Sequence, residues 1–288
     1  MSVEIAERAG FCFGVKRAIS MATEILDSHQ DSTEPIYILG EIIHNPQTVE
    51  MLEKKGAISI TEEDLEKVEP GKLILRSHGA PLEVIEKAKK LNFEIINTVC
   101  PFVKKAQIIS NKHIESDYKI VIVGKKEHPE VKALLSHSGF KAQVIGSVEE
   151  IPNLNLTTDD DVVIIVQTTF SVREFKNIIG EIALLSRETK VYNTICNATF
   201  RRRKGALSVA QKVDINIVVG GKNSSNTREL TNFLKDSGFL AYQIERPEEL
   251  TKDLFTQVKK VGITGGASTP MWVIEKVKIC IENILDSR

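Results

Sequence analysis

The stretch from residue 119 to residue 135, KIVIVGKKEHPEVKALL, decides the fold class of this chain. It begins with a short apolar run, reaches a glycine and a polar loop, and then places Val131, Leu134 and Leu135 on one face of a helix. A strand followed directly by a helix is typical of units with parallel strands. The stretch therefore predicts an α/β protein.

The same pattern occurs twice more along the chain. IYILGEIIHNPQTVEML begins at Ile36, and INIVVGGKNSSNTRELTNFL begins at Ile215. Each copy is followed by a second apolar strand that ends in a polar loop, in the segments KLILRSHGAP, VVIIVQTTFS and VGITGGASTP. Because self-similarity at a fixed period indicates repeated structural units, the sequence predicts three equivalent α/β units.

Three of the four cysteines stand at matching places in this repeat. GFCFGVKRAI surrounds Cys12, TVCPFVKKAQ surrounds Cys100 and TICNATFRRRKGA surrounds Cys196. We therefore expect three pseudo-equivalent α/β domains with mainly parallel sheets, in which the three thiolates meet at one centre. The expected domains are residues 13–100, 101–196 and 197–288.

Three converging thiolates narrow the choice of metal. Structural zinc normally closes its shell with four protein ligands, whereas a catalytic zinc with three ligands remains open as an alternative. Iron–sulfur clusters are held by cysteine thiolates, and three of them leave one iron of a cubane without a protein ligand. The fourth cysteine, Cys280, lies in an amphipathic terminal segment and is expected to be a core residue.

Polar residues follow the repeated strands, where parallel α/β sheets carry their binding sites. The candidate substrate-binding residues are His44, His78, His128, Thr168, Ser224, Ser225, Asn226 and Ser268. The Ser224–Asn226 run after two glycines is suited to a small diphosphate, although hydroxyl and amide groups at a helix start also serve as caps. Glu130 is a candidate catalytic proton donor if it is buried, and an ordinary first-turn acid otherwise.

Charge and hydropathy exclude several classes of function. Lys and Arg number 38 against 39 Asp and Glu, which gives no support for a nucleic-acid partner. We read no signal peptide and no apolar run long enough to span a membrane, so a cytoplasmic location is expected. The basic runs that follow the three cysteines are expected to be solvated faces or a docking surface for an acidic electron donor.

Taken together, the motifs resemble the 4-hydroxy-3-methylbut-2-enyl diphosphate reductase family over essentially the whole chain. The motifs are AGFCFGVKRA, GEIIHNPQTV, RSHGAP, NTVCPFV, GKKEHPEV, QTTFSV, TICNAT, GGKNSSNT and TGGASTP. The resemblance implies reductive removal of an allylic hydroxyl, which gives isopentenyl and dimethylallyl diphosphates plus water in the last step of the non-mevalonate pathway.

The resemblance also implies a set of partners and roles. One [4Fe–4S] cluster would be bound by Cys12, Cys100 and Cys196, the eight polar residues above would line the substrate pocket, and Glu130 would donate a proton. Ferredoxin or flavodoxin type proteins would supply electrons. The chain departs from the family near Arg203, where a glutamine is usual; the extra cation is expected to alter helix packing near Cys196 or the docking face without touching the ligand set.

Two other readings remain open at this point. One is another three-lobed iron–sulfur enzyme of quinolinate-synthase-like type, which the SSN and HPE loops disfavour. The other is a non-enzymatic cluster protein that acts as a redox sensor, which would more often close its cluster with four cysteines.

Overall fold

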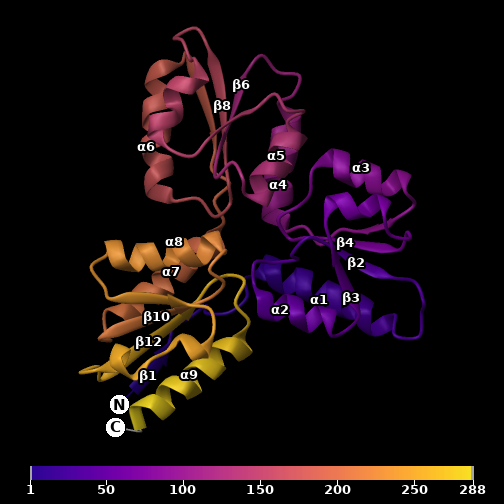
Figure 1. The fold of residues 1–288 in the computed structure, drawn as a ribbon. Coiled ribbons are helices and arrows are strands. Elements are labelled where there is room, and N and C mark those ends of the chain that lie inside the picture. The colour runs from indigo at the N-terminus through magenta and orange to yellow at the C-terminus, as the bar shows by residue number, and fades with distance from the viewer. Residues whose placement is uncertain (1, 287–288) are drawn as a thin grey trace. The chain divides into compact units, whose positions relative to one another are not determined.

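The computed structural model describes residues 2–286 and contains three parallel β-sheets flanked by helices (Figure 1). The chain forms two compact units, which we describe separately. The first contains Met1–Lys16, Ile43–Met51 and Asn197–Arg288, and the second contains Arg17–Ile42 and Leu52–Cys196. Within residues 2–286, no helix combines the length and apolarity that crossing a membrane requires.

The first unit is built on one sheet, here called sheet A. Its strands, in spatial order, are β1 (Ser2–Ile5), β12 (Lys260–Gly265), β10 (Ile215–Val219) and β11 (Ala241–Ile244). Helices pack against both faces of the sheet (Figure 1). They are α7 (Asn197–Ala210) with α8 (Ser225–Asp236), and α9 (Met271–Asp286). Because both faces are covered, β10 is buried throughout, and all of its residues except Asn216 are apolar.

The second unit contains the other two sheets. Sheet B has the order β3 (Ala57–Ile60), β2 (Ile36–Leu39), β4 (Lys72–Leu75) and β5 (Glu94–Ile96). Sheet C has the order β7 (Gln143–Ile145), β6 (Lys119–Val123), β8 (Asp161–Val166) and β9 (Glu188–Tyr192). All pairings in the three sheets are parallel. The expected α/β class with parallel sheets is therefore confirmed.

Helices connect these strands. Around sheet C, α4 (Pro101–Lys112) and α5 (Pro129–His137) pack on one face, and α6 (Val172–Leu185) packs on the other. The remaining α-helices of the described chain are α1 (Phe13–Ser28), α2 (Pro46–Glu53) and α3 (Leu82–Lys90). Short 3₁₀ helices occur at Glu62–Glu66, Val148–Leu154, Pro247–Glu249 and Lys252–Phe255.

The three sheets repeat one hydrogen-bond pattern at the carboxyl ends of their strands. Gly40, Gly124 and Gly220 directly follow the inner strands β2, β6 and β10. Their N–H groups donate to the last residues of the edge strands, to Ile60, Ile145 and Ile244, over 2.8, 2.9 and 2.8 Å. The repeat inferred from sequence is thus present in the backbone bonding.

Two strands in each sheet were not predicted. The sequence pattern predicts only the two inner, mainly apolar strands of each unit, whereas each sheet has two further edge strands. Edge strands are partly exposed and lack a long apolar run, as in β1, where half-buried and exposed residues alternate. Since β1 completes sheet A from the start of the chain, residues before Cys12 belong with the last sheet. The division at residues 100 and 196 stays a prediction.

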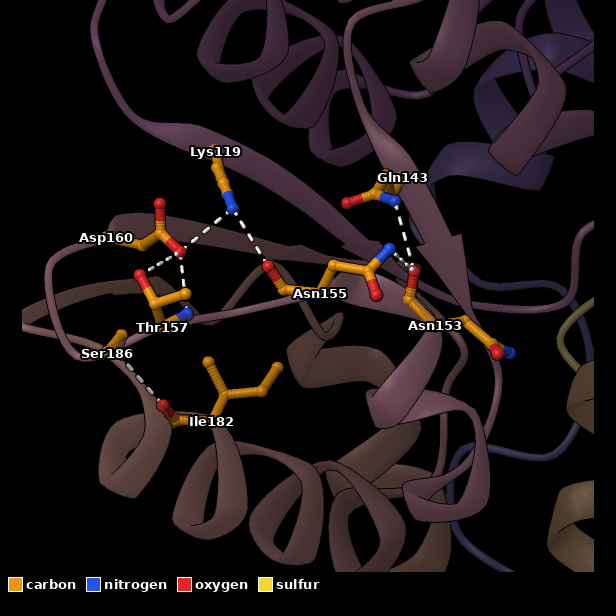
Figure 2. Close-up of polar contacts among 8 residues, drawn as sticks. All are labelled: Lys119, Gln143, Asn153, Asn155, Thr157, Asp160, Ile182 and Ser186. Carbon is orange, nitrogen blue, oxygen red and sulfur yellow. Dashed lines mark hydrogen bonds and ion pairs between the residues drawn. The ribbon is translucent and has the colours of Figure 1, made fainter.

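The amino ends of the sheet C strands are fixed by polar contacts (Figure 2). Lys119 Nζ, at the start of β6, donates to Asp160 Oδ2 over 2.8 Å and to the carbonyl of Asn155 over 3.1 Å. The same Asp160 oxygen accepts from the N–H and hydroxyl of Thr157, over 2.7 and 3.0 Å. These bonds tie the loop before β8 to the first residue of β6.

Candidate functional site

Each of the three matching cysteines stands immediately before a helix. Cys12 precedes α1, Cys100 is the N-cap residue of α4 and Cys196 precedes α7, and all three are half-buried. A helix N-terminus favours negative charge, so these are suitable places for thiolate ligands.

The backbone of each cysteine is held in the same way by the end of an inner strand. The N–H of Cys12 donates to Ala267 O, that of Cys100 to Ser77 O and that of Cys196 to Thr168 O, over 3.0, 3.0 and 2.8 Å. Each acceptor lies two residues beyond the end of its strand, β12, β4 or β8. The backbone N–H of each cysteine is therefore bound at an equivalent strand end, in agreement with the repeat.

Two of the cysteines end an Asn-Thr-x-Cys motif whose first residues have a structural role. Thr98 and Thr194, each two positions before its cysteine, donate their hydroxyls to the carbonyls of the last strand residues, Leu75 and Val166. The preceding asparagines accept the N–H of the residue just before the cysteine, over 3.1 and 3.2 Å. These side chains lock the turn that presents the thiol.

Glu130 is buried in the second unit, with 1% of its surface exposed. It lies in the first turn of α5, and its carboxyl accepts two hydrogen bonds from Thr168. The N–H of Thr168 donates to Oε1 over 2.6 Å, and its hydroxyl donates to Oε2 over 2.8 Å. Burial raises the pKa of Glu130 to about 7, against the opposing effect of the two Thr168 bonds. A carboxyl with this pKa can hold and release a proton near neutral pH.

Two histidines of the second unit lie together. The rings of His78 and His128 are 5.4 Å apart, centroid to centroid, in an edge-to-face arrangement. His128 is also the cap of α5, because its Nδ1 accepts the N–H of Glu130 over 3.1 Å. In the neutral ring that makes this bond, the proton is therefore carried by Nε2.

The first unit gathers the remaining candidates at the start of α8. Ser224 caps this helix by accepting the N–H of Thr227 over 3.3 Å, and the hydroxyl of Ser268 lies 3.5 Å from that of Ser224. The Ser268 hydroxyl also donates to the carbonyl of His44 over 3.2 Å. A side chain at Gly221 would come within 2.7 Å of the same carbonyl, so only glycine lets these segments approach.

The Ser224–Asn226 run combines capping with an available donor. Ser225 and Asn226 are buried, and the side-chain Nδ2 of Asn226 has no hydrogen-bond partner among residues 2–286. An unpaired buried amide nitrogen costs free energy unless a ligand or water accepts from it. The cap and the binding roles, which sequence left as alternatives, are therefore compatible at this helix start.

Of the other residues discussed from sequence, Cys280 packs against the core of sheet A, and burial raises the pKa of its thiol. Arg203 packs between α7 and α8, where it pairs with Glu229 over 3.8 Å and stacks on Phe233. Its effect is therefore on helix packing.

Sequence reasoning missed Arg202, which was assigned to a solvated basic run but is buried. Nothing in a run of four cations distinguishes the buried one.

Comparison with known proteins gives consistent matches over nearly the whole chain. The family model described as LytB protein matches residues 3–282. A 4-hydroxy-3-methylbut-2-enyl diphosphate reductase of Caldanaerobacter subterraneus subsp. tengcongensis is 44% identical over 278 residues, covering 96% of this chain and 95% of the relative. That of Aquifex aeolicus is 41% identical over 291 residues, covering 100% and 98%.

Solved structures agree with this result. A structure of (E)-4-hydroxy-3-methyl-but-2-enyl diphosphate reductase, described as the terminal enzyme of the non-mevalonate pathway, has 41% identity and a TM-score of 0.72, covering 98% of this chain and all of that one. The E-1-hydroxy-2-methyl-but-2-enyl-4-diphosphate reductase of Plasmodium falciparum has 29% identity and a TM-score of 0.89, covering 96% and 87%.

Proposed function

This chain belongs to the LytB family, and from that premise we infer that it reduces 4-hydroxy-3-methylbut-2-enyl diphosphate as the terminal enzyme of the non-mevalonate pathway. In this reaction the allylic C–O bond breaks, and two electrons and two protons are consumed. One proton leaves with the hydroxyl as water, and the other is added to the carbon skeleton. The products are isopentenyl and dimethylallyl diphosphates.

Cys12, Cys100 and Cys196 are proposed to hold one [4Fe–4S] cluster. The donor set fits this group, because all three are half-buried thiols before a helix and are held by matching backbone bonds. Zinc is disfavoured, since three thiolates are not among its usual catalytic ligand sets. When bound, the cluster supplies electrons and a Lewis-acidic iron that has no protein ligand.

The diphosphate is proposed to bind with the start of α8 as its main anchor. The helix N-terminus, the hydroxyls of Ser224, Ser225 and Ser268, and the unpaired Nδ2 of Asn226 supply neutral donors for an anion. His44, His78 and His128 are proposed to contact the same substrate. Neutral donors of this kind suit a small diphosphate enclosed by protein better than they suit a large, exposed polyanion.

The observation that carries the catalytic proposal is the buried carboxyl of Glu130. Its pKa of about 7 means that near neutral pH much of it is protonated and able to act as an acid. Thr168 orients the carboxyl through two hydrogen bonds, and burial keeps bulk water from competing for the proton. A proton held at this carboxyl can be given to the departing hydroxyl oxygen.

The electron donor is proposed to be a small acidic protein of ferredoxin or flavodoxin type. Exposed cations near the cysteines support this, since the three helices carry solvent-exposed cations within their first five residues, namely Lys16, Lys104, Lys105 and Arg201. Charge complementarity of this kind increases the rate of association between redox partners.

The test is anaerobic reconstitution of the full chain with iron and sulfide, followed by reduction of the hydroxylated diphosphate with a chemical electron donor. We expect absorbance near 400 nm and formation of both isomeric diphosphates. Serine at Cys12, Cys100 or Cys196 should lower iron content and turnover together, whereas serine at Cys280 should leave both unchanged. A brown protein that consumes none of this substrate would contradict the proposed reaction.

A further inference from the structure

The segment before Cys12 lacks the threonine that anchors the other two cysteine segments. At Cys100 and Cys196, the residue two positions earlier is a threonine that donates to the carbonyl of the last residue of an inner strand. At Cys12 that position is Gly10, which has no side chain. The corresponding strand is β12, and its last residue is Gly265.

The guanidinium of Arg202 occupies the place of the missing hydroxyl. Its Nη1 donates to the carbonyl of Gly265 over 2.8 Å, at the same strand position that the threonines bind in sheets B and C. Its Nη2 donates to the carbonyl of Gly10 over 2.8 Å, and Nη1 also donates to that of Arg8. One buried side chain therefore ties the end of β12 to the loop that leads to Cys12.

The loop needs this support because of its backbone. Arg8 and Gly10 both have positive φ, at 66° and 93°, and a residue other than glycine seldom adopts that conformation unless its surroundings hold it. The planar guanidinium holds its donors on separate nitrogens in a fixed fork, whereas the three donors of a lysine ammonium share one nitrogen and have no fixed orientation. Arg202 is 3% exposed, whereas Arg201 beside it on α7 is exposed.

A second cation near a cysteine behaves similarly. Arg17, on α1, donates to the carbonyl of Val99 over 3.3 Å, directly before Cys100. The basic pairs that follow the cysteines in sequence thus include residues that hold the approach to a cysteine, in addition to exposed ones.

We propose that Arg202 is a positioning residue for Cys12, which replaces the threonine of the other two segments and presents the thiol as a cluster ligand. The proposal rests on the cluster assigned under the proposed function. It predicts a local effect: loss of Arg202 should loosen the loop before Cys12 and weaken cluster retention, while sheet A remains folded.

The experiment compares Arg202→Lys with Arg201→Lys in the full chain, both prepared anaerobically. Hydrogen exchange is measured by mass spectrometry on the cluster-free proteins, and loss of the 400 nm absorbance under a chelator is measured on the loaded ones. For Arg202→Lys we expect exchange at residues 8–12 to rise about tenfold or more, with β10 unchanged, and the cluster lifetime to fall about fivefold or more. Arg201→Lys should match the parent protein.

Thr194→Val supplies a matched counterpart, since it removes the equivalent anchor at Cys196 and should produce the same pair of changes there. Equal exchange and equal cluster lifetime in Arg202→Lys and Arg201→Lys would overturn the proposal. So would faster exchange with an unchanged cluster lifetime, because Arg202 would then shape the loop without serving the ligand. A parent protein that binds no cluster would contradict the proposed cofactor. A parent that binds the cluster, together with an Arg202→Lys variant that retains it equally well, would contradict only the role of Arg202.

Discussion

The two ends of β6 and β8 hold carboxyl groups with nearly the same hydrogen-bond donors. At the carboxyl end, Glu130 accepts the N–H and hydroxyl of Thr168. At the amino end, Asp160 accepts the N–H and hydroxyl of Thr157, and it also accepts from Lys119 (Figure 2). The pKa of Glu130 is raised to about 7, whereas the pKa of Asp160 is lowered, most strongly by its bond to Lys119.

The difference lies in burial and in the lysine. The carboxyl of Glu130 is sealed from water, and this desolvation favours its neutral form more than the two bonds from the uncharged Thr168 favour its charged form. Asp160 remains near the surface beside an ammonium, so the charged form is favoured. Two threonine donors alone therefore do not determine the charge of a carboxyl. The same local motif serves as a structural anchor at one end of the sheet and as a candidate acid at the other.

The largest expected effect comes from replacing the candidate acid. Glu130→Gln should lower turnover of the hydroxylated diphosphate by about 10²–10⁴-fold, because an amide cannot donate the proton. Absorbance near 400 nm and iron content should be retained, which separates loss of acid catalysis from loss of the cluster. Asp160→Asn is the control, and turnover within about twofold of the parent is expected. Equal activity of the two variants would contradict the assignment of Glu130.

A second difference concerns stability as a function of pH. Since the pKa of Glu130 rises from 4.5 to about 7 on folding, the folded state binds this proton more tightly than the unfolded state does. Proton binding at Glu130 therefore contributes about 3 kcal/mol to the free energy of unfolding below pH 4.5. This contribution is lost as pH rises through 7. Urea unfolding of the cluster-free parent and Glu130→Gln at pH 5 and pH 8 should show this relative loss in the parent only. A constant difference between the two proteins would show that the pKa is not raised.

A smaller effect is expected from Thr168→Val, which removes one donor to Glu130 and retains the backbone N–H. Because the hydroxyl bond lowers the pKa of Glu130, its loss should raise that pKa. In the parent, kcat/KM should fall about tenfold per pH unit above pH 7, as the acid loses its proton. In the variant, the fall in kcat/KM should begin at a higher pH than in the parent, whatever the change in maximal rate. A fall that begins at the same pH or at a lower pH would contradict the hydrogen bond from the Thr168 hydroxyl to Glu130.

The smallest effect is expected at the amino end. Asp160→Asn weakens the bond from Lys119 and the bonds from Thr157 at an exposed position, where ion pairs contribute little. The melting temperature at pH 7 should fall by about 1–2 °C. Because the pKa of Asp160 is lowered on folding, this difference should vanish as pH falls below its ordinary value of 3.8. A difference that does not begin to shrink below pH 3.8 would point to packing as its source.

Much of this fold could be predicted from sequence, since the inner strands carry an unmistakable pattern. Residues 120–123 in β6 and 217–219 in β10 are apolar because helices cover both faces, and the loops after these strands carry the candidate site residues. The position of these polar residues at strand ends therefore follows from the sequence alone. The burial of Glu130 does not, because a first-turn acid reads the same whether it is exposed or buried.

Other features could not be found in this way. β1 has no apolar run, and its pairing joins residues that are far apart in the chain, Ser2 with Lys260. Short, half-exposed strands gain their stability from the partner, and the partner is not visible in local sequence. The role of Arg202 could not be predicted for a similar reason. Its partners are the backbone carbonyls of Arg8, Gly10 and Gly265, and backbone groups leave no signature in the sequence.

The late pairing of β1 has a consequence for the order in which the protein matures on the ribosome. The backbone bonds from Cys100 to Ser77 and from Cys196 to Thr168 span 23 and 28 residues. Both bonds can therefore form soon after the two cysteines leave the ribosome. The bond from Cys12 to Ala267 spans 255 residues, which at ordinary translation rates means a wait of roughly 10–50 s. Of the three cysteines, the first along the chain is thus the last whose backbone N–H finds its partner, and loading of the proposed cluster is expected to follow the synthesis of residue 267.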